Sequence, residues 1–196
     1  MLNKKLLLGT IAVFAALLAW VTFFWQPGNT RLAEAPRGGD FTLNSAQGPL
    51  TLHDLRGKVV LLYFGYTMCP DICPTSLAFT AQGMAQLDAK ELEKVQMLFV
   101  SVDPERDTLE RLKEYTAFFH PNIAGLTGTP AEIARVAKLY GASYARQQVG
   151  SAAGYVVDHS ADTYVVAPDG SLYATLPHAT PPGKVAEKIR AALNKP

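Results

Sequence analysis

The chain has two cysteines, Cys69 and Cys73, and three residues separate them. They follow an unbroken apolar run at residues 59–64 (VVLLYF), which is typical of a buried strand. Two thiols at the end of such a strand can form a redox couple or supply two ligands of a soft-metal site. A disulfide between them would close a very short loop and stabilise the fold little, so a purely structural bridge is a poor explanation.

Two prolines shape the loop that carries the thiols. Pro70 disfavours helical geometry at Cys69, whereas Pro74 suits a first helical position and places Cys73 at the start of a helix. The unpaired backbone N–H groups and the dipole of that helix lower the pKa of a thiol there. We therefore expect Cys73 to ionise readily, as both redox chemistry and metal binding require.

The spacing of the thiols leaves both chemistries open. Two sulfurs on one metal ion would lie roughly 4 Å apart, against about 2.05 Å in a disulfide. The extra residue relative to a C-x-x-C motif gives the loop freedom to open that gap, and a disulfide remains possible when no metal is bound. Two thiolates with one imidazole would form a soft, low-coordinate site suited to Cu(I), with Cu(II) also accessible.

The region from residue 41 to residue 196 has the size of one domain with a substantial core. From residue 26 onward the chain carries 16 basic and 17 acidic side chains, so it has no net charge that would attract nucleic acid. The pattern predicts strands alternating with helices, and hence an α/β fold with a mixed central sheet. In order, we expect a hairpin at 41–43 and 50–52, a strand at 59–64, a helix at 76–92, a strand at 95–102, a helix at 108–120, a short strand or turn at 125–128, a helix at 130–140, a hairpin at 162–167 and 171–175, and a closing helix at 182–193.

This order of elements, with thiols at the first strand-to-helix turn, resembles the thioredoxin fold. Thioredoxin-like oxidoreductases carry C-x-x-C at this turn and a proline opposite it, just before a later strand. Here the motif is C-x-x-x-C, and residues 159–163 (HSADT) contain no proline. Both departures weaken the interpretation as a disulfide-exchange enzyme.

Four histidines could supply a third ligand. His53 follows the first hairpin, His120 ends a helix, and His178 lies in a proline-rich segment, so an ordinary surface or helix-end role suits each of them. His159 stands between an irregular loop at 150–154 and the strand near 163–166. In the fold expected here that stretch faces the thiol-bearing turn, which favours His159 as a metal ligand. Met68, beside Cys69, is either a fourth soft ligand or, more simply, a residue at the rim of the core.

Acidic residues gather near the same segments. Asp71, Asp103 and Asp107 are candidates for steering a positively charged partner or metal complex toward the site. The alternative is that Asp103 and Asp107 cap the turn and helix that follow, with Arg106 as a surface partner. Further carboxylates in these segments belong to Glu105, Asp158 and Asp162.

The N-terminus predicts a membrane anchor. Residues 6–25 are uncharged and mostly apolar, and as a helix they could cross a hydrocarbon core of roughly 30 Å. Lys4 and Lys5 precede this run, so the positive-inside rule leaves the N-terminus in the cytoplasm and the rest of the chain outside. We assign residues 1–26 to the anchor and 27–40 to a linker. A cleaved signal peptide is the alternative, but the run is longer than is usual for one. A single-pass protein of a bacterial inner membrane, with its folded domain in the periplasm, is the simplest outcome.

Three separated segments carry a more specific resemblance. Residues 63–74 (YFGYTMCPDICP), 102–108 (VDPERDT) and 157–160 (VDHS) together resemble the Sco (SenC) family of membrane-anchored copper proteins, which assist assembly of cytochrome c oxidase. The resemblance implies that Cys69, Cys73 and His159 are copper ligands. It also implies transfer of copper to the dinuclear copper centre of oxidase subunit II, and a copper donor chaperone upstream.

The leading hypothesis is therefore a copper metallochaperone with no enzymatic turnover. The runner-up is a thiol-disulfide oxidoreductase, in which Cys69 and Cys73 form a redox-active disulfide that keeps the client's copper-ligand cysteines reduced. A thiol peroxidase is a third possibility, since related folds bind peroxide at the same turn. Because thiol exchange needs no imidazole at ligand distance, the placement of His159 separates the first two hypotheses.

Overall fold

The computed structural model describes residues 4–24, 38–150 and 154–195. The chain divides into two units, residues 1–35 and residues 36–196, and each is described by itself.

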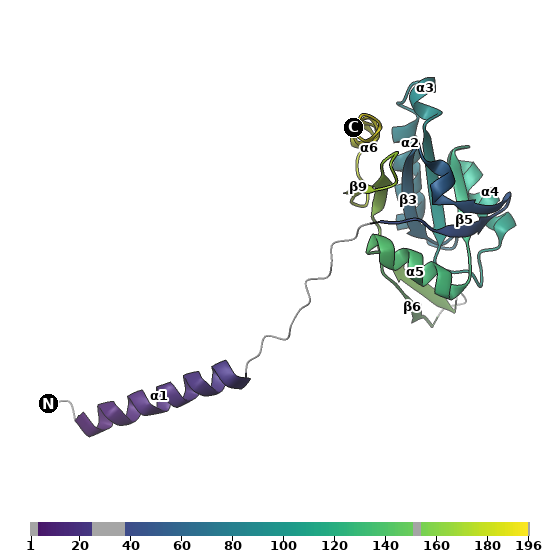
Figure 1. Ribbon diagram of the computed structural model, residues 1–196. Coiled ribbons are helices and arrows are strands. Elements are labelled where there is room, and N and C mark those ends of the chain that lie inside the picture. The colour runs from purple at the N-terminus through teal and green to yellow at the C-terminus, as the bar shows by residue number, and fades with distance from the viewer. Residues whose placement is uncertain (1–3, 25–37, 151–153, 196) are drawn as a thin grey trace. The chain divides into compact units, whose positions relative to one another are not determined.

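The described residues of the N-terminal unit form the helix α1 (Lys4–Phe24), which Figure 1 draws in purple. Large apolar side chains such as Leu8, Phe14 and Trp20 are exposed along it. The side chains of α1 are described for residues 7–22 only, and no helix built from described residues is both long enough and apolar enough to cross a membrane. Membrane anchoring thus stays a prediction.

The folded unit is built on a seven-stranded mixed sheet with the strand order β2-β1-β5-β4-β3-β8-β9. The central strands β3, β4 and β5 run parallel, and the other pairs are antiparallel. Every residue of β3 is buried, as its unbroken apolar sequence predicts. The strands are β1 (Thr42–Ser45), β2 (Gly48–Thr51), β3 (Val59–Gly65), β4 (Val95–Ser101), β5 (Ile123–Thr127), β8 (Thr163–Val166) and β9 (Leu172–Leu176).

Helices cover the sheet on both faces (Figure 1). Neighbouring residues of β3 point to opposite faces. Tyr63 stacks on Phe99 on one face, and on the other Phe64 packs against Tyr140 of α5. The helices are η1 (Leu52–Leu55, a 3-10 helix), α2 (Ile72–Met84), α3 (Ala89–Leu92), α4 (Leu109–Phe119), α5 (Pro130–Tyr140) and α6 (Pro182–Leu193).

The predicted helix at 76–92 is wrong as a single element. The structure forms α2 up to Met84 and then a separate short helix, α3. Asp88 and Glu91 cap the start of α3 with reciprocal side-chain-to-backbone hydrogen bonds, and this capping box begins a new helix where the periodicity alone suggests continuation. The capping box predicted at Thr129 and Glu132 of α5 is confirmed.

A two-stranded antiparallel ribbon lies outside the main sheet and was not predicted as strands. It consists of β6 (Tyr144–Gln148) and β7 (Tyr155–His159), paired so that Tyr144 lies opposite His159. Much of β6 is exposed, so the ribbon lacks the apolar run by which buried strands are recognised. In Figure 1 β6 lies beside α5 at one end of the domain.

The last residues of the predicted linker contact the folded unit. The Gly38 backbone N–H donates to the Leu139 carbonyl oxygen at 3.1 Å, and the Tyr140 hydroxyl donates to the Gly39 carbonyl oxygen at 3.0 Å. Arg56 pairs with both carboxylate oxygens of Asp40. The predicted linker up to residue 37 lies outside the described residues.

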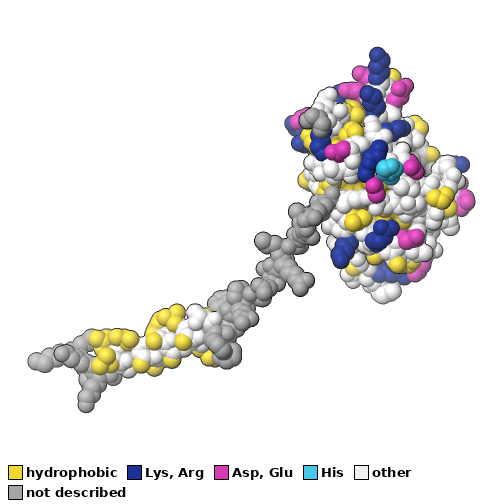
Figure 2. All heavy atoms as spheres, viewed as in Figure 1, with side chains coloured by type: hydrophobic (Ala, Val, Ile, Leu, Met, Phe, Trp, Pro, Cys, Tyr) yellow, Lys and Arg dark blue, Asp and Glu magenta, His cyan; other side chains and the backbone are white. Residues whose placement is uncertain are grey.

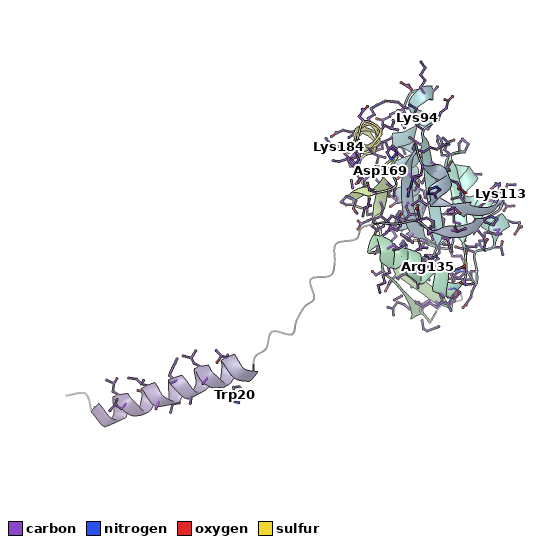
Figure 3. All side chains as sticks on the ribbon, in the orientation of Figure 1. Trp20, Lys94, Lys113, Arg135, Asp169 and Lys184 are labelled. Atoms are coloured by element: carbon purple, nitrogen blue, oxygen red, sulfur yellow. The ribbon has the colours of Figure 1, made fainter. Side chains whose placement is uncertain are left out.

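Charged side chains are spread over the domain. Lys94 follows α3, Lys113 lies on α4, and Arg135 and Lys184 lie on α5 and α6 (Figure 3). On the face shown in Figure 2, basic and acidic side chains intermingle. This distribution agrees with the nearly balanced charge of the sequence.

The contact between α2 and α6 gives a test of the packing. A Cβ atom at Gly83 would lie 2.7 Å from the Val185 Cβ and 2.9 Å from the Pro182 carbonyl oxygen. We expect Gly83→Ala to push the two helices apart and lower the free energy of unfolding by about 1–3 kcal/mol, measured by urea denaturation. Gly183→Ala is the control, since a Cβ there meets only the Gln86 side chain at 3.8 Å. Equal stability of the two variants would contradict this packing.

Candidate metal centre

The two cysteines lie where the central strand passes into a helix. β3 ends at Gly65, Cys69 lies in the loop that follows, and Cys73 lies in the first turn of α2. Neither cysteine is in a disulfide. Cys73 is fully buried, whereas Cys69 keeps about a tenth of its surface exposed. The two thiols therefore differ in accessibility although they share one loop.

His159 ends β7 and brings its imidazole to the thiols. The His159 Nε2 lies 3.2 Å from the Cys73 Sγ. The ligand atoms of Cys69, Cys73 and His159 all lie within 4.8 Å of one another, and among the described residues this is the one cluster of histidine, cysteine or acidic side chains close enough to share a metal ion. A sulfur and a nitrogen bound to one ion at about 2.3 Å and 2.0 Å would lie roughly 3.5 Å apart, so the three donors fit a single ion.

The hydrogen bond on the other ring nitrogen orients the imidazole. The His159 Nδ1 lies 3.0 Å from the Ser160 carbonyl oxygen. Because a carbonyl oxygen only accepts, Nδ1 carries the hydrogen, and the Nε2 lone pair faces the thiols. Tyr63 and Tyr66 meet the ring edge-on, with centroids 6.0 and 5.8 Å away. A neutral imidazole held in this way is the form that binds a metal ion.

The thiols differ in acidity in the opposite sense to the expectation from the sequence. A hydrogen bond from Cys73 is the main cause that lowers the pKa of Cys69, to about 4. Burial raises the pKa of Cys73 well above its ordinary value. The helix start favours a thiolate at Cys73, but the loss of water around a fully buried sulfur outweighs it. Cys69 is thus the readily ionised thiol.

Gly65 makes room for the buried thiol. A Cβ atom at this position would lie 2.7 Å from the Cys73 Sγ and 2.9 Å from a ring carbon of Phe99. Only glycine lets the end of β3 approach the sulfur so closely.

Asp107 organises the loop that carries Cys69. Its carboxylate accepts hydrogen bonds from the Thr67 backbone N–H at 3.0 Å and the Thr67 hydroxyl at 2.6 Å. The Ser101 hydroxyl donates to it at 2.7 Å. These hydrogen bonds hold residues 66–71, the cysteine loop, in place. Because Asp107 is buried, its carboxylate presents no charge at the surface.

Asp103 is also buried and paired. Its carboxylate forms an ion pair with Arg106 and accepts a hydrogen bond from the Tyr155 hydroxyl at 2.8 Å. Arg146 lies 3.7 Å from the same carboxylate. The expectation that Asp103 and Asp107 steer a partner is therefore corrected, because both side chains are used inside the protein. The residue that caps the start of α4 is Thr108 and not Asp103 or Asp107. Asp71, the third steering candidate, is exposed.

The remaining soft or basic candidates lie outside the cluster. The His53 Nδ1 lies 3.8 Å from an Asp40 carboxylate oxygen, the His120 Nδ1 accepts from the Asn122 backbone N–H, and the His178 Nδ1 lies 2.9 Å from the Ser76 hydroxyl. Met68 is exposed beside Cys69, as suits a residue at the rim.

A shallow hollow of about 330 Å³ opens beside Cys69 and His159. Its walls come from both ligand-bearing segments, the cysteine loop and β7. Most of the lining is apolar, and two exposed carboxylates, Asp71 and Asp158, border it. The other lining residues are Tyr66, Pro70, Ile72, Val156 and Val157.

Sequence reasoning did not find the residues that position the ligands. Tyr155 and Arg146 lie on the unpredicted ribbon, and Gly65 and Thr67 carry no donor suited to a metal. The alternation of larger side chains at Tyr155, Val157 and His159 after a glycine-containing loop is a period-two signal that could have indicated β7.

The fold and the three converging side chains define a class of protein: a thioredoxin-like α/β domain with a Cys-Cys-His centre at the turn after a central strand. The chain matches the SCO1/SenC family over residues 29–194, and it belongs to that family.

Curated relatives agree with this assignment. The chain is 41% identical to the mitochondrial protein SCO2 of Saccharomyces cerevisiae over 158 residues, which cover 80% of this chain and 52% of the yeast protein. It is 40% identical to the mitochondrial SCO2 homolog of Bos taurus over 154 residues, which cover 78% of this chain and 58% of the bovine protein. The chain thus spans less than two thirds of the length of either relative.

Solved structures share the fold. Apo Sco1 from Thermus thermophilus superimposes with a TM-score of 0.73 at 39% identity, covering 81% of this chain and 92% of that one. Copper-bound ScoI from Bradyrhizobium japonicum gives a TM-score of 0.72 at 36% identity, covering 79% and 98%. BsSco, a Sco family member in which a disulfide switch was identified, gives a TM-score of 0.64 at 26% identity, covering 83% and 96%.

The difference between the thiols predicts their reactivity. Between about pH 8 and about pH 6, alkylation of an ordinary thiol slows roughly tenfold per pH unit, whereas alkylation of Cys69 should stay nearly constant because its pKa lies below this range. Cys73 should resist alkylation throughout, since it is fully buried. The measurement is iodoacetamide labelling of the reduced protein, followed by mass spectrometry of each cysteine.

Cys73→Ala serves as the control for this experiment. The variant removes the hydrogen bond that lowers the pKa of Cys69 most, so alkylation of Cys69 should become dependent on pH. A tenfold decrease per pH unit at Cys69 of the unmodified protein would contradict the assignment.

Proposed function

We propose that the protein is a copper metallochaperone that binds one copper ion through Cys69, Cys73 and His159. The observation that carries the proposal is the convergence of two thiols and a correctly oriented imidazole within 4.8 Å of one another. Soft thiolates select Cu(I), and the imidazole makes Cu(II) accessible as well. Copper is bound in the solved structure of ScoI from Bradyrhizobium japonicum, and this supports copper as the metal of the present protein.

The arrangement suits transfer of the ion better than storage. Three protein ligands leave copper open to an incoming ligand, as associative exchange needs. Cys69 reaches the hollow, whereas Cys73 is buried behind it. An incoming thiolate or imidazole would therefore approach from the side of Cys69 and His159, and Cys73 would be the last ligand to release the ion.

We infer that the client is the dinuclear copper centre of cytochrome c oxidase subunit II, and that a copper donor chaperone loads the site. The support is membership of the SCO1/SenC family together with BsSco, which is named as one of the Sco family of cytochrome c oxidase assembly proteins. Nucleic acid is not among the proposed partners, since the charges of the domain are balanced.

We also propose that residues 1–26 anchor the protein in a bacterial inner membrane with the folded unit in the periplasm. Support comes from the uncharged run at 6–25, the preceding Lys4 and Lys5, and the exposed apolar side chains of α1. The hydrocarbon core is the environment in which such side chains are stable.

A second function, thiol-disulfide exchange, is favoured by the low pKa of Cys69. A Cys69 thiolate can attack a client disulfide and form a mixed disulfide, which Cys73 then resolves. The two electrons reduce the client to a dithiol, and Cys69 and Cys73 become a disulfide. The disulfide switch in BsSco supports this chemistry for a relative. Copper-loaded and disulfide forms exclude each other, so metal loading would depend on redox state.

Removing the imidazole separates the two functions. His159→Ala should lower the affinity for Cu(II) at least about 100-fold, since even changes to residues that only support a ligand cost 10–100-fold. Exchange of the Cys69–Cys73 disulfide should persist. The measurement is a copper titration of the reduced protein, following the thiolate-to-Cu(II) charge-transfer absorption.

His178→Ala is the matched control, because this histidine contacts Ser76 and lies outside the cluster. Unchanged copper stoichiometry and affinity in His159→Ala would refute the three-ligand site.

The exposed carboxylate beside the hollow gives a test of partner steering. Asp71→Asn should slow association with the soluble domain of oxidase subunit II roughly 2- to 5-fold and weaken its salt dependence, with copper affinity unchanged. Stopped-flow mixing at several ionic strengths measures both effects. Glu93→Gln is the control, since Glu93 is exposed just before β4, at the opposite end of the parallel strands. Equal rates for all three proteins would exclude Asp71 from steering.

A further inference from the structure

The segment between β4 and α4 contacts both chain segments that carry the candidate ligands. Asp107 binds Thr67 of the cysteine loop. Asp103 and Arg106 bind Tyr155, the first residue of the strand that ends at His159. Arg106 is a surface partner in the alternative in which Asp103 and Asp107 are caps, but only 18% of its side chain is exposed.

Contacts with three side chains hold Tyr155 in place. The Arg106 guanidinium carbon lies 3.7 Å from the centroid of the Tyr155 ring, and that of Arg146 lies 4.4 Å from it. Arg106 Nη1 also donates to the Tyr155 carbonyl oxygen at 3.0 Å, and the Tyr155 hydroxyl donates to Asp103 at 2.8 Å. Arg146, from β6, pairs with Glu105 at 2.9 Å, so both strands of the ribbon are tied to the same segment.

Arg106 reaches the cysteine loop as well. Its guanidinium carbon lies 5.6 Å from the centroid of Tyr66, the residue directly after β3. Tyr66 in turn packs edge-on against the His159 ring. One guanidinium therefore lies between an aromatic ring of the cysteine loop and an aromatic ring of the ribbon.

The ribbon needs such a link, because His159 belongs to a separate two-stranded sheet. An isolated two-stranded ribbon is marginally stable in water. The hydrogen bonds between Ser143 and Ser160 close the ribbon on itself and do not join it to the main sheet. Four residue steps separate Tyr155 from His159, about 13 Å along a strand, so a fixed Tyr155 limits pivoting of the whole strand.

We propose that Arg106 is a positioning residue for His159: by joining Tyr155 of the ribbon to Tyr66 and Asp103, it keeps the imidazole at ligand distance from the two thiols. The inference rests on the proposed function only in its use of copper as the probe. A guanidinium is required because its planar fork stacks on the Tyr155 ring, lies within cation-π range of the Tyr66 ring, and donates to a backbone carbonyl and a carboxylate at once. A lysine ammonium cannot make all of these contacts.

The test is a double-mutant cycle with Arg106→Lys and His159→Ala. Arg106→Lys keeps a positive charge beside the buried Asp103, so no carboxylate is left without a cation. Arg106→Lys alone should weaken Cu(II) binding by about 10-fold or more. In the His159→Ala background the same substitution should change the remaining affinity by less than about 2-fold, since there is no imidazole left to position.

Arg190→Lys is the matched control. Arg190 of α6 also donates to a carboxylate, that of Glu91, but it lies on another surface and does not contact the ribbon. It should leave Cu(II) affinity unchanged in both backgrounds. An equal loss on Arg106→Lys with and without His159 would overturn the proposal, and so would no loss in either.

A measurement without metal makes the proposal independent of copper binding. In the reduced, metal-free protein, Arg106→Lys should speed hydrogen exchange of the backbone amides of residues 155–159 by about 10-fold or more while leaving those of α6 unchanged. Unchanged exchange in the ribbon would overturn the proposal. If the unmodified protein showed no His159-dependent Cu(II) binding, the proposed function would fail, and the exchange experiment would still decide the role of Arg106.

Discussion

The contact between the Cys73 Sγ and the His159 Nε2 sets the requirements that the surrounding structure meets. The two residues are 86 positions apart in the chain, and their atoms lie 3.2 Å apart. Gly65 leaves room for the sulfur, and the Ser160 carbonyl oxygen fixes which ring nitrogen is free. An imidazole oriented toward the sulfurs in this way would be unnecessary for a thiol pair acting alone, which is why the contact points toward metal binding.

The two thiols differ in acidity and in exposure because their environments differ. Burial keeps Cys73 protonated and out of reach of solvent, and its hydrogen bond stabilises the thiolate of Cys69 at the edge of the hollow. In the proposed function, Cys69 would be the first point of contact for an incoming metal ion or a client sulfur, and Cys73 the second. The same asymmetry would suit both of the proposed reactions, copper transfer and disulfide exchange, because both would begin at an accessible thiolate and finish at a protected partner.

Two of the acidic residues near the site, Asp103 and Asp107, act inside the protein. Asp107 holds the cysteine loop through Thr67, and Asp103 holds the ribbon through Tyr155 with the help of Arg106. A short segment between β4 and α4 therefore joins the two parts of the chain that bring the ligands together. Asp71 and Asp158 remain at the surface, beside a mostly apolar hollow. A partner would meet a few exposed carboxylates around apolar side chains rather than a broad acidic surface.

The sequence by itself determined the buried strand before the thiols, the capped helix α5 and the α/β order, because hydrophobic runs and capping residues are local signals. The choice of His159 rested on its place in the expected fold and on the family resemblance, and the structure brings its imidazole to the thiols. The helical periodicity of residues 76–92 wrongly predicted one continuous helix there, since the capping box at Asp88 starts a second helix, α3. Only the tertiary structure decided which thiol ionises and where the aspartates point. Burial of Cys73, of Asp103 and of Asp107 arises from packing between segments far apart in the chain, and the cost of removing a charge from water depends on that packing and not on neighbours in sequence.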